Sequence, residues 1–450
     1  MIRLHDTATG QIRELATREP GKVSMYVCGI TADNVPHLGH GRFALVFDVL
    51  RRYLEWTGLE VTHVSNITDV DDKIIARAER EGRTEAEVAA EFEAVWWDAL
   101  DRLDVRRPTA DPHATAWIAE MVEMVGELVD RGVAYETSDG VYLEVAQVDG
   151  YGLLARQPLE SLRAGARVEA NDEKRSPVDF AVWKKAKPGE PSWPSPWGAG
   201  RPGWHTECVV MSLGLLGEGF DIHGGGQDLA FPHHENERAQ AVALGRTFAT
   251  HWVHNGWVVV EGEKMSKSLG NFTTLVDLLE RTDQRAYRLL VLQAHYRSPI
   301  EVTASTLERA VATLAGLDAF ARSTVDLDGE PDAERLDRFR EAMDDDLDTP
   351  RAMALVFTAV RDTNAALSAG DRAAAAPLAA TVRAVCAALG LELDDGTGDR
   401  VDDDTAALVS RRDAARAARD WPAADAARDE LVARGWVVED TPTGTRIHRA

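Results

Sequence analysis

Two short segments of the chain carry histidines and lysines at spacings suited to a nucleotide. His37 and His40 follow an apolar run at residues 24–30 that predicts a buried parallel strand. Imidazoles and backbone N–H groups at the start of the next helix would face nucleotide phosphates. Lys264 and Lys267 follow a predicted strand at 257–260, and two ammonium groups suit a pyrophosphate leaving group, whose charge grows in the transition state. A histidine pair on a helix or a solvated Lys/Ser loop would explain either motif alone, but both in this order predict a split ATP site.

A third group of residues could hold a metal ion. Cys28 lies near the end of the first strand, Cys208 lies far along the chain, and His233 and Glu237 are four residues apart, so that both project from one face of a predicted helix. Two thiolates, one imidazole and one carboxylate form a plausible tetrahedral zinc set. The spacing matches no zinc finger, so small buried cysteines and a polar helix start remain alternatives. We expect Cys386 to pack in a core.

The charge of the chain limits its partners. A net charge of −25 and a pI of about 4.9 weigh against a nucleic-acid partner, because such proteins usually present a basic face. Only local charge matters at contact, however, because the Debye length is about 8 Å at physiological salt. Residues 405–450 carry eight arginines against seven acidic residues. That segment could therefore still contact a polyanion.

The sequence shows no sign of export or membrane insertion. The first residues lack a basic segment followed by an apolar one, and no run reaches about 18 apolar residues. Three cysteines are too few for a disulfide framework and would be thiols or metal ligands in a reducing compartment. We expect a cytoplasmic protein with no membrane partner, and we take it to be a monomer.

The order of predicted elements favours an α/β fold with a Rossmann-like, doubly wound parallel sheet. Residues 1–107 alternate strand and helix, with a helix at 39–56, a second strand at 61–66 and one long helix at 71–103. This alternation predicts the first half of a catalytic domain.

The second half of that domain is predicted at residues 202–300, after an insertion at 108–201. The insertion begins with a helix at 114–131, continues with a hairpin that turns at 138–140, and ends in a stretch rich in proline, glycine and tryptophan. An insertion into one sheet explains why the two halves of an ATP site lie so far apart in sequence.

The rest of the chain is predicted to be mainly helical. Residues 301–393 predict a helix bundle, in which Thr349 and Pro350 are the N-cap and first residue of a helix and Gly390 is a stop. After an Asp-rich linker, residues 399–450 predict two Ala/Arg-rich helices and a short hairpin, which is a small α+β domain.

Taken together, these motifs resemble those of cysteinyl-tRNA synthetases, a family of class I aminoacyl-tRNA synthetases, along nearly the whole chain. The resemblance rests on residues 25–31 (MYVCGIT), 36–40 (PHLGH), 66–73 (NITDVDDK), 203–208 (GWHTEC), 231–237 (FPHHENE) and 264–271 (KMSKSLGN). It implies activation of L-cysteine by ATP and transfer to the 3′-terminal ribose of tRNA(Cys), with residues 399–450 binding the anticodon.

The resemblance also implies a role for each candidate site residue. One zinc ion, which binds the substrate thiolate, is held by Cys28, Cys208, His233 and Glu237. The catalytic residues are His37, His40, Lys264 and Lys267. ATP, which brings Mg²⁺ with it, is contacted by Gly39, Asp228 and Lys267. The cysteine pocket contains Thr31, Thr68 and Trp204.

A zinc ion would explain how such a site distinguishes cysteine from serine. A plain cavity discriminates poorly between isosteres, by about a hundredfold. Zinc deprotonates a coordinating thiol and prefers sulfur to oxygen. We therefore expect no editing domain, and the insertion is small for one.

The chain departs from the family pattern in two places. Family members commonly end their last hairpin with Gly-Thr-x-Trp, but residues 444–447 read GTRI, so Ile447 offers no aromatic platform to the anticodon. Residues 285–288 (RAYR) match the bundle-entry motif Asp-Ala-Leu-Arg only loosely.

Two other functions are compatible with part of the sequence. A related ligase that joins cysteine to an amino sugar in thiol-cofactor synthesis uses the same adenylation site and is the main alternative, but the helices and hairpin after Gly390 favour the tRNA-charging enzyme. A tRNA- or zinc-binding protein without catalysis is disfavoured, because both histidines and both lysines are present.

Overall fold

The structure is a computed structural model and describes residues 1–158, 161, 172–259, 274–397, 402–441 and 444–449. The chain divides into two units. The first comprises Met1–Glu308, Arg338–Met353 and Ala388–Gly390, and the second comprises Arg309–Asp337, Ala354–Ala387 and Leu391–Ala450.

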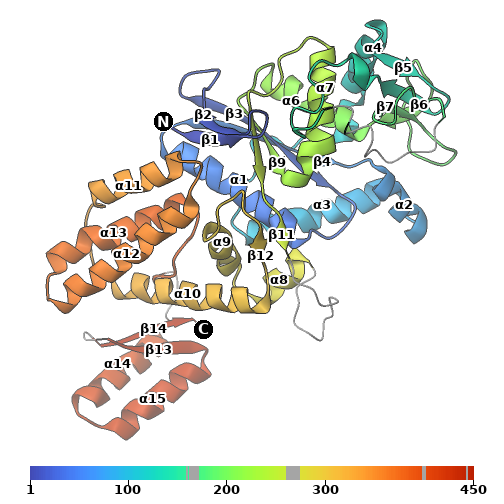
Figure 1. The fold of residues 1–450 in the computed structure, drawn as a ribbon. Coiled ribbons are helices and arrows are strands. Elements are labelled where there is room, and N and C mark those ends of the chain that lie inside the picture. The colour runs from blue at the N-terminus through green and yellow to red at the C-terminus, as the bar shows by residue number, and fades with distance from the viewer. Residues whose placement is uncertain (159–160, 162–171, 260–273, 398–401, 442–443, 450) are drawn as a thin grey trace. The chain divides into compact units, whose positions relative to one another are not determined.

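A four-stranded parallel sheet in the order β10-β9-β3-β4 forms the centre of the first unit (Figure 1). Its strands are β3 (Lys22–Thr31), β4 (Glu60–Thr68), β9 (Ile222–Gly226) and β10 (His251–Asn255). The apolar run predicted as a strand thus becomes a central strand, buried on both faces. Because all strands run in one direction, their carboxyl ends share one edge of the sheet.

Helices cover both faces of this sheet. Successive side chains of a strand point to opposite faces. Val27 of β3 lines a small cavity with Phe47 of α1 (Leu38–Trp56), whereas Cys28 joins a core cluster with Cys208 of α6 (Trp204–Leu216). Gly224 in β9 allows α1 to pack closely, because a Cβ there would collide with the Phe47 ring. The predicted doubly wound α/β fold is therefore confirmed.

The single long helix predicted at 71–103 is wrong, because the chain forms α2 (Asp72–Glu81) and α3 (Glu85–Arg102). Gly82 ends α2 in the left-handed conformation, with a φ of 66°. Thr84 then begins α3 with a capping box, in which its backbone N–H donates to the Glu87 carboxylate at 2.9 Å. These two local signals outweigh a helical pattern that is otherwise continuous.

The insertion forms its own antiparallel sheet in the order β5-β6-β7-β8. Its elements are η1 (Ala114–Trp117), α4 (Ile118–Asp130), β5 (Ala134–Glu136), β6 (Gly140–Leu143), η2 (Val145–Gln147), β7 (Phe180–Lys185) and β8 (Gly200–Pro202). The predicted hairpin at 138–140 is confirmed. The predicted helix at 114–131 begins as the 3₁₀ turn η1 and continues as α4.

The remaining elements of the first unit precede β3, connect β9 to β10, or follow β10 along the chain. They are β1 (Arg3–Asp6), β2 (Gln11–Glu14), η3 (Gln227–Leu229), η4 (Ala230–His234), α7 (Glu235–Ala243), β11 (Val258–Val259), α8 (Leu275–Arg281), α9 (Gln284–Leu292) and β12 (Ile300–Glu301). The strand predicted at 257–260 is limited to β11 in the described residues, and it pairs with β12 outside the central sheet.

Residues after Glu301 are mainly helical, as predicted. The helices are α10 (Ala304–Ser323), α11 (Ala333–Asp344), α12 (Thr349–Ser368) and α13 (Arg372–Ala388). Thr349 is not the N-cap of α12. Asp348 takes that role, because its side chain accepts the Arg351 N–H at 3.0 Å. Gly390 follows α13 with a φ of 69°, which confirms the predicted stop.

The C-terminal segment has a small core of its own. Its elements are α14 (Asp403–Ala417), α15 (Trp421–Ala433), β13 (Trp436–Thr441) and β14 (Gly444–Arg449). Leu408, Leu431 and Trp436 pack together there, as expected for a small α+β domain. Across the described part of the chain, no helix has both the length and the apolar character needed to span a bilayer.

Candidate active site

The carboxyl ends of β3, β9 and β10 border a cleft of about 680 Å³. Side chains at this edge of a parallel sheet converge even when their strands are far apart in sequence. The cleft is lined by seven predicted site residues, Cys28, Thr31, His37, Gly39, His40, Trp204 and Asp228. It is also lined by residues that sequence analysis did not single out, among them Lys73 and Trp257.

The four predicted metal ligands, Cys28, Cys208, His233 and Glu237, are buried with their donor atoms within 4.8 Å of one another. The Sγ atom of Cys28 lies 3.7 Å from that of Cys208 and 3.4 Å from Oε1 of Glu237. Nε2 of His233 lies 3.6 Å from Sγ of Cys208 and 2.9 Å from Oε1 of Glu237. Residues separated by up to 209 positions thus form one cluster.

The local backbone explains how these ligands meet. The register of β3 against β4 shifts between Val27 and Ile30, and this bulge holds the backbone beside Cys28. Gly29 makes the close approach possible, because a Cβ would collide with the Asn66 carbonyl, and its N–H donates to Oδ1 of Asn66 at 3.0 Å. His233 lies in the π-helical turn η4, which continues directly into α7, so His233 and Glu237 project from the same helical face as predicted, with Nε2 of His233 2.9 Å from Oε1 of Glu237.

The donor atoms have the separations of a tetrahedral zinc site. Zinc–sulfur bonds of about 2.3 Å and zinc–nitrogen bonds of about 2.0 Å place two sulfurs about 3.8 Å apart and a sulfur and a nitrogen about 3.5 Å apart. The observed separations are 3.7 and 3.6 Å. Burial and the neighbouring sulfur and carboxylate raise the pKa of Cys28 well above its usual range, because anions crowd together there. A dication would relieve that repulsion, so the residues fit zinc.

A second group of donors shares Cys28 and Glu237 but replaces the other two ligands with His223 and His234. Nε2 of His223 lies 2.6 Å from Oε2 of Glu237, and Nδ1 of His234 lies 2.8 Å from Nε2 of His254. Only the first group has two soft sulfur donors. His223 instead occupies the position of a histidine that orients a ligating carboxylate. Sequence analysis missed His223 and His234, because no spacing pattern distinguishes them from His233.

His37 and His40 lie at the start of α1, where His37 is the N-cap residue. Their rings stack with centroids 3.7 Å apart, and the His37 N–H donates to Nδ1 of His40 at 3.2 Å. Burial lowers the pKa of His40 to about 3 and also lowers that of His37. Both rings are therefore neutral at pH 7. Because Nδ1 of His40 accepts a hydrogen bond, its Nε2 carries the proton and can donate to a phosphate oxygen.

Two glycines keep the backbone open near these histidines and Asp228. A Cβ on Gly39 would lie 2.9 Å from the ring of His37, and one on Gly226 would lie 2.5 Å from Oδ1 of Asp228. Asp228 itself is exposed in η3, where its carboxylate is accessible to a ligand.

Of the three residues predicted for the cysteine pocket, two line the cleft and one does not. Thr31 and Trp204 line the cleft, and the Trp204 indole stacks on the His233 ring with centroids 4.0 Å apart. Thr68 is buried, does not line the cleft, and donates its hydroxyl to Glu207 at 2.8 Å. Burial raises the pKa of Glu207 well above its usual range. Lys264 and Lys267 lie outside the described residues.

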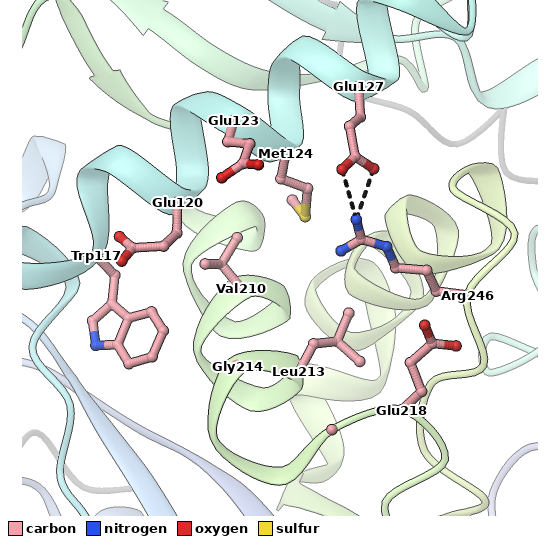
Figure 2. A pocket seen from close by; sticks show the side chains of 11 residues that line it. Trp117, Glu120, Glu123, Met124, Glu127, Val210, Leu213, Gly214, Glu218 and Arg246 are labelled. Carbon is pink, nitrogen blue, oxygen red and sulfur yellow. Dashed lines mark hydrogen bonds and ion pairs between the residues drawn. The ribbon is translucent and has the colours of Figure 1, made fainter.

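A second cavity, of about 410 Å³, lies between α4 and α6 (Figure 2). Four glutamates line it, and the single arginine in its wall, Arg246, pairs with Glu127 at 2.7 Å. The negative charge of this wall would repel a phosphate. The cleft at the end of the parallel sheet is therefore the better candidate for a nucleotide site.

Three family models match successive parts of the chain. The model described as the tRNA synthetases class I (C) catalytic domain matches residues 14–312. The DALR domain matches residues 338–394, and the cysteinyl-tRNA ligase anticodon binding domain matches residues 399–447.

Named relatives and a solved structure agree with these models. The chain is 46% identical to the cysteine–tRNA ligase of Streptomyces griseus, with 99% of this chain and 98% of the relative covered. It is 45% identical to that of Halorhodospira halophila, with both chains covered completely. Mycobacterium tuberculosis methionyl-tRNA synthetase in complex with methionyl-adenylate superposes with a TM-score of 0.60 at 15% identity, over 82% of this chain and 90% of that one, which shows the shared fold. The chain therefore belongs to the cysteinyl-tRNA synthetase family of class I aminoacyl-tRNA synthetases.

Proposed function

We propose that this protein joins L-cysteine to tRNA(Cys) in two steps. The carboxylate of cysteine attacks the α-phosphate of ATP, which gives cysteinyl-adenylate and releases pyrophosphate. A 3′-terminal ribose hydroxyl of the tRNA then takes the cysteinyl group, and AMP leaves. The single observation that carries this proposal is the pair of buried sulfurs 3.7 Å apart beside a cleft lined by His37 and His40.

Selection of cysteine would come from the four buried ligands. Zinc held by Cys28, Cys208, His233 and Glu237 would bind the substrate as a thiolate and so favour cysteine over serine. Trp204, stacked on His233, and Thr31 would form walls of the cysteine pocket. Thr68 would act from behind the cleft through its hydrogen bond with Glu207.

Activation of the carboxylate would depend on the groups that face ATP. His37 and His40 would donate N–H groups to the phosphates as neutral imidazoles, and Gly39 would let the phosphates approach the backbone of α1. Asp228 would accept hydrogen bonds from the ribose hydroxyls. Lys264 and Lys267, with the Mg²⁺ that accompanies ATP, would neutralise the departing pyrophosphate.

Each segment of the chain would have a separate role in this reaction. Residues 1–107 and 202–300 would form the catalytic domain, 108–201 the connective insertion, 301–393 the helical bundle, and 399–450 the domain that binds the anticodon of tRNA(Cys). The separate core of that last segment supports the division. Because its substrate is a tRNA, we place the protein in the cytoplasm, and we propose that it acts as a monomer.

Two assays on the same preparation test the function. We expect cysteine-dependent exchange of pyrophosphate into ATP without tRNA, and attachment of cysteine to a tRNA(Cys) transcript. Joining of cysteine to an amino sugar, with no charging of tRNA, would instead establish the alternative ligase. That alternative is not favoured, because an anticodon-binding model matches residues 399–447.

A further inference from the structure

Trp257 presents an exposed indole to the candidate nucleotide cleft. It lines the same cleft as His37 and His40, yet it is 55% exposed. The other tryptophan that lines the cleft, Trp204, has one ring face stacked on His233. Within the described residues, the Trp257 ring stacks on no other aromatic ring and has no cation above it. A large apolar surface is therefore available to a ligand in this cleft.

The backbone that carries this indole is held firmly. Arg42 of α1 is completely buried, and its guanidinium donates to the carbonyl of Trp257 at 2.6 Å, to that of Tyr296 at 3.1 Å and to that of Ser298. The N–H of Ile300 also donates to the Trp257 carbonyl, at 2.9 Å. Within the described residues, no carboxylate pairs with Arg42, so carbonyl groups supply the contacts that offset its buried charge.

The glycine before Trp257 tightens this arrangement. A Cβ on Gly256 would collide with the carbonyl of Arg297, so only glycine lets the two segments approach this closely. The backbone at Gly256 and Trp257 is thus held in place, and the flat indole of Trp257 is exposed. Such preorganisation lowers the entropy lost when a ligand binds.

We propose that Trp257 is a stacking platform for a purine ring bound in this cleft. The proposal rests on the proposed function. It gives a role to a residue outside the two predicted ATP-binding segments, which carry His37 and His40 and Lys264 and Lys267. Purines stack on aromatic side chains through their π faces, without a requirement for particular hydrogen-bonding groups. Two purines enter this site during the reaction, namely the adenine of ATP and the terminal adenosine of tRNA. Both offer the same ring, so the experiment must distinguish them.

The test compares W257L, which removes the flat ring, with W257F, which keeps an aromatic face. Loss of one base-stacking contact corresponds to roughly a 5- to 150-fold weakening. We expect W257L to raise by this factor the KM for ATP in pyrophosphate exchange if the partner is ATP, or the KM for tRNA at saturating ATP if the partner is the terminal adenosine. W257F should restore most of the affinity. The KM for cysteine, kcat at saturation and zinc content should not change.

The matched control is L215A, which removes an apolar side chain that is 40% exposed on α6 and should leave every KM unchanged. Wild-type KM values for both ATP and tRNA in W257L would overturn the proposal. A loss in W257L that W257F does not rescue, or that extends to cysteine and to thermal stability, would overturn it too. Calorimetric titration of the wild type and of W257L with ATP alone measures binding without turnover. The stacking proposal can therefore be tested even if the protein does not charge tRNA(Cys), so the two proposals can fail independently.

Discussion

The metal site allows a sharp prediction because the chain supplies its own control. Cys208 and Cys386 are both 1% exposed, but only Cys208 has a second thiol 3.7 Å away and an imidazole 3.6 Å away. We predict that C208A loses zinc and cysteine activation together. We predict that C386A keeps both, because Cys386 lies in α13, where it serves the packing of the helices.

The expected size of the effect follows from the number of ligands. Binding of zinc to a four-ligand structural site is worth about 10 to 16 kcal/mol, so one ligand of four contributes about 2.5 to 4 kcal/mol. This corresponds to a loss of roughly two to three orders of magnitude in zinc affinity. Loss of one buried atom costs each variant only about 1 kcal/mol of packing. Both variants should therefore remain folded.

The measurement is zinc content by mass spectrometry after dialysis against a chelator of known affinity, together with cysteine-dependent pyrophosphate exchange. Thermal unfolding of both variants after a strong chelator has removed zinc from each checks that packing losses are equal. If C208A kept one zinc per chain, or if it activated cysteine without zinc, the assignment of Cys208 as a ligand would be refuted. Equal zinc loss in C386A would show that the effect comes from packing.

Three further predictions concern other parts of the chain. Replacing Lys267 with Ala should lower pyrophosphate exchange by roughly two to three decades, because one contact to developing charge is worth about 2.7 to 4 kcal/mol; zinc content should be unchanged, and wild-type exchange would remove Lys267 from the mechanism. Deleting residues 399–450 should leave exchange nearly intact and greatly weaken tRNA charging, whereas a parallel fall in both activities would indicate a structural role for this segment. Asp6 anchors β1: burial alone would raise its pKa, but the Trp252 N–H at 3.0 Å and Arg13 at 2.9 Å lower it below its usual value. The unfolded chain therefore takes up this proton first as the pH falls, so the contribution of Asp6 to the free energy of unfolding is present above about pH 4 and is lost below it. D6N should flatten this part of the pH dependence in urea unfolding between about pH 3 and pH 7, and an unchanged slope would contradict the assignment.

Much of the candidate site could be predicted because its parts are local. A strand followed by a helix start places His37 and His40 at the carboxyl edge of a sheet whatever its other strands are. Gly390 was recognised as a stop by the same kind of local rule. The missed break at Gly82 and the misplaced cap at Asp348 were also local signals, and a stricter reading of capping residues would have found both.

The sequence by itself determined most of the segments that form strands and helices, though not the break at Gly82, and it determined which residues could bind a nucleotide or a metal, because periodicity and capping act over a few residues. Only the tertiary structure decided which of these candidates meet. The pairing of β3 with β9 joins segments almost 200 residues apart and brings the Cys208 and Glu237 side chains to Cys28. The packing of α1 likewise buries Arg42 under Trp257, 215 residues away. No spacing rule reaches that far, because such contacts depend on how elements cross in space, and that crossing is set by the packing of the whole core.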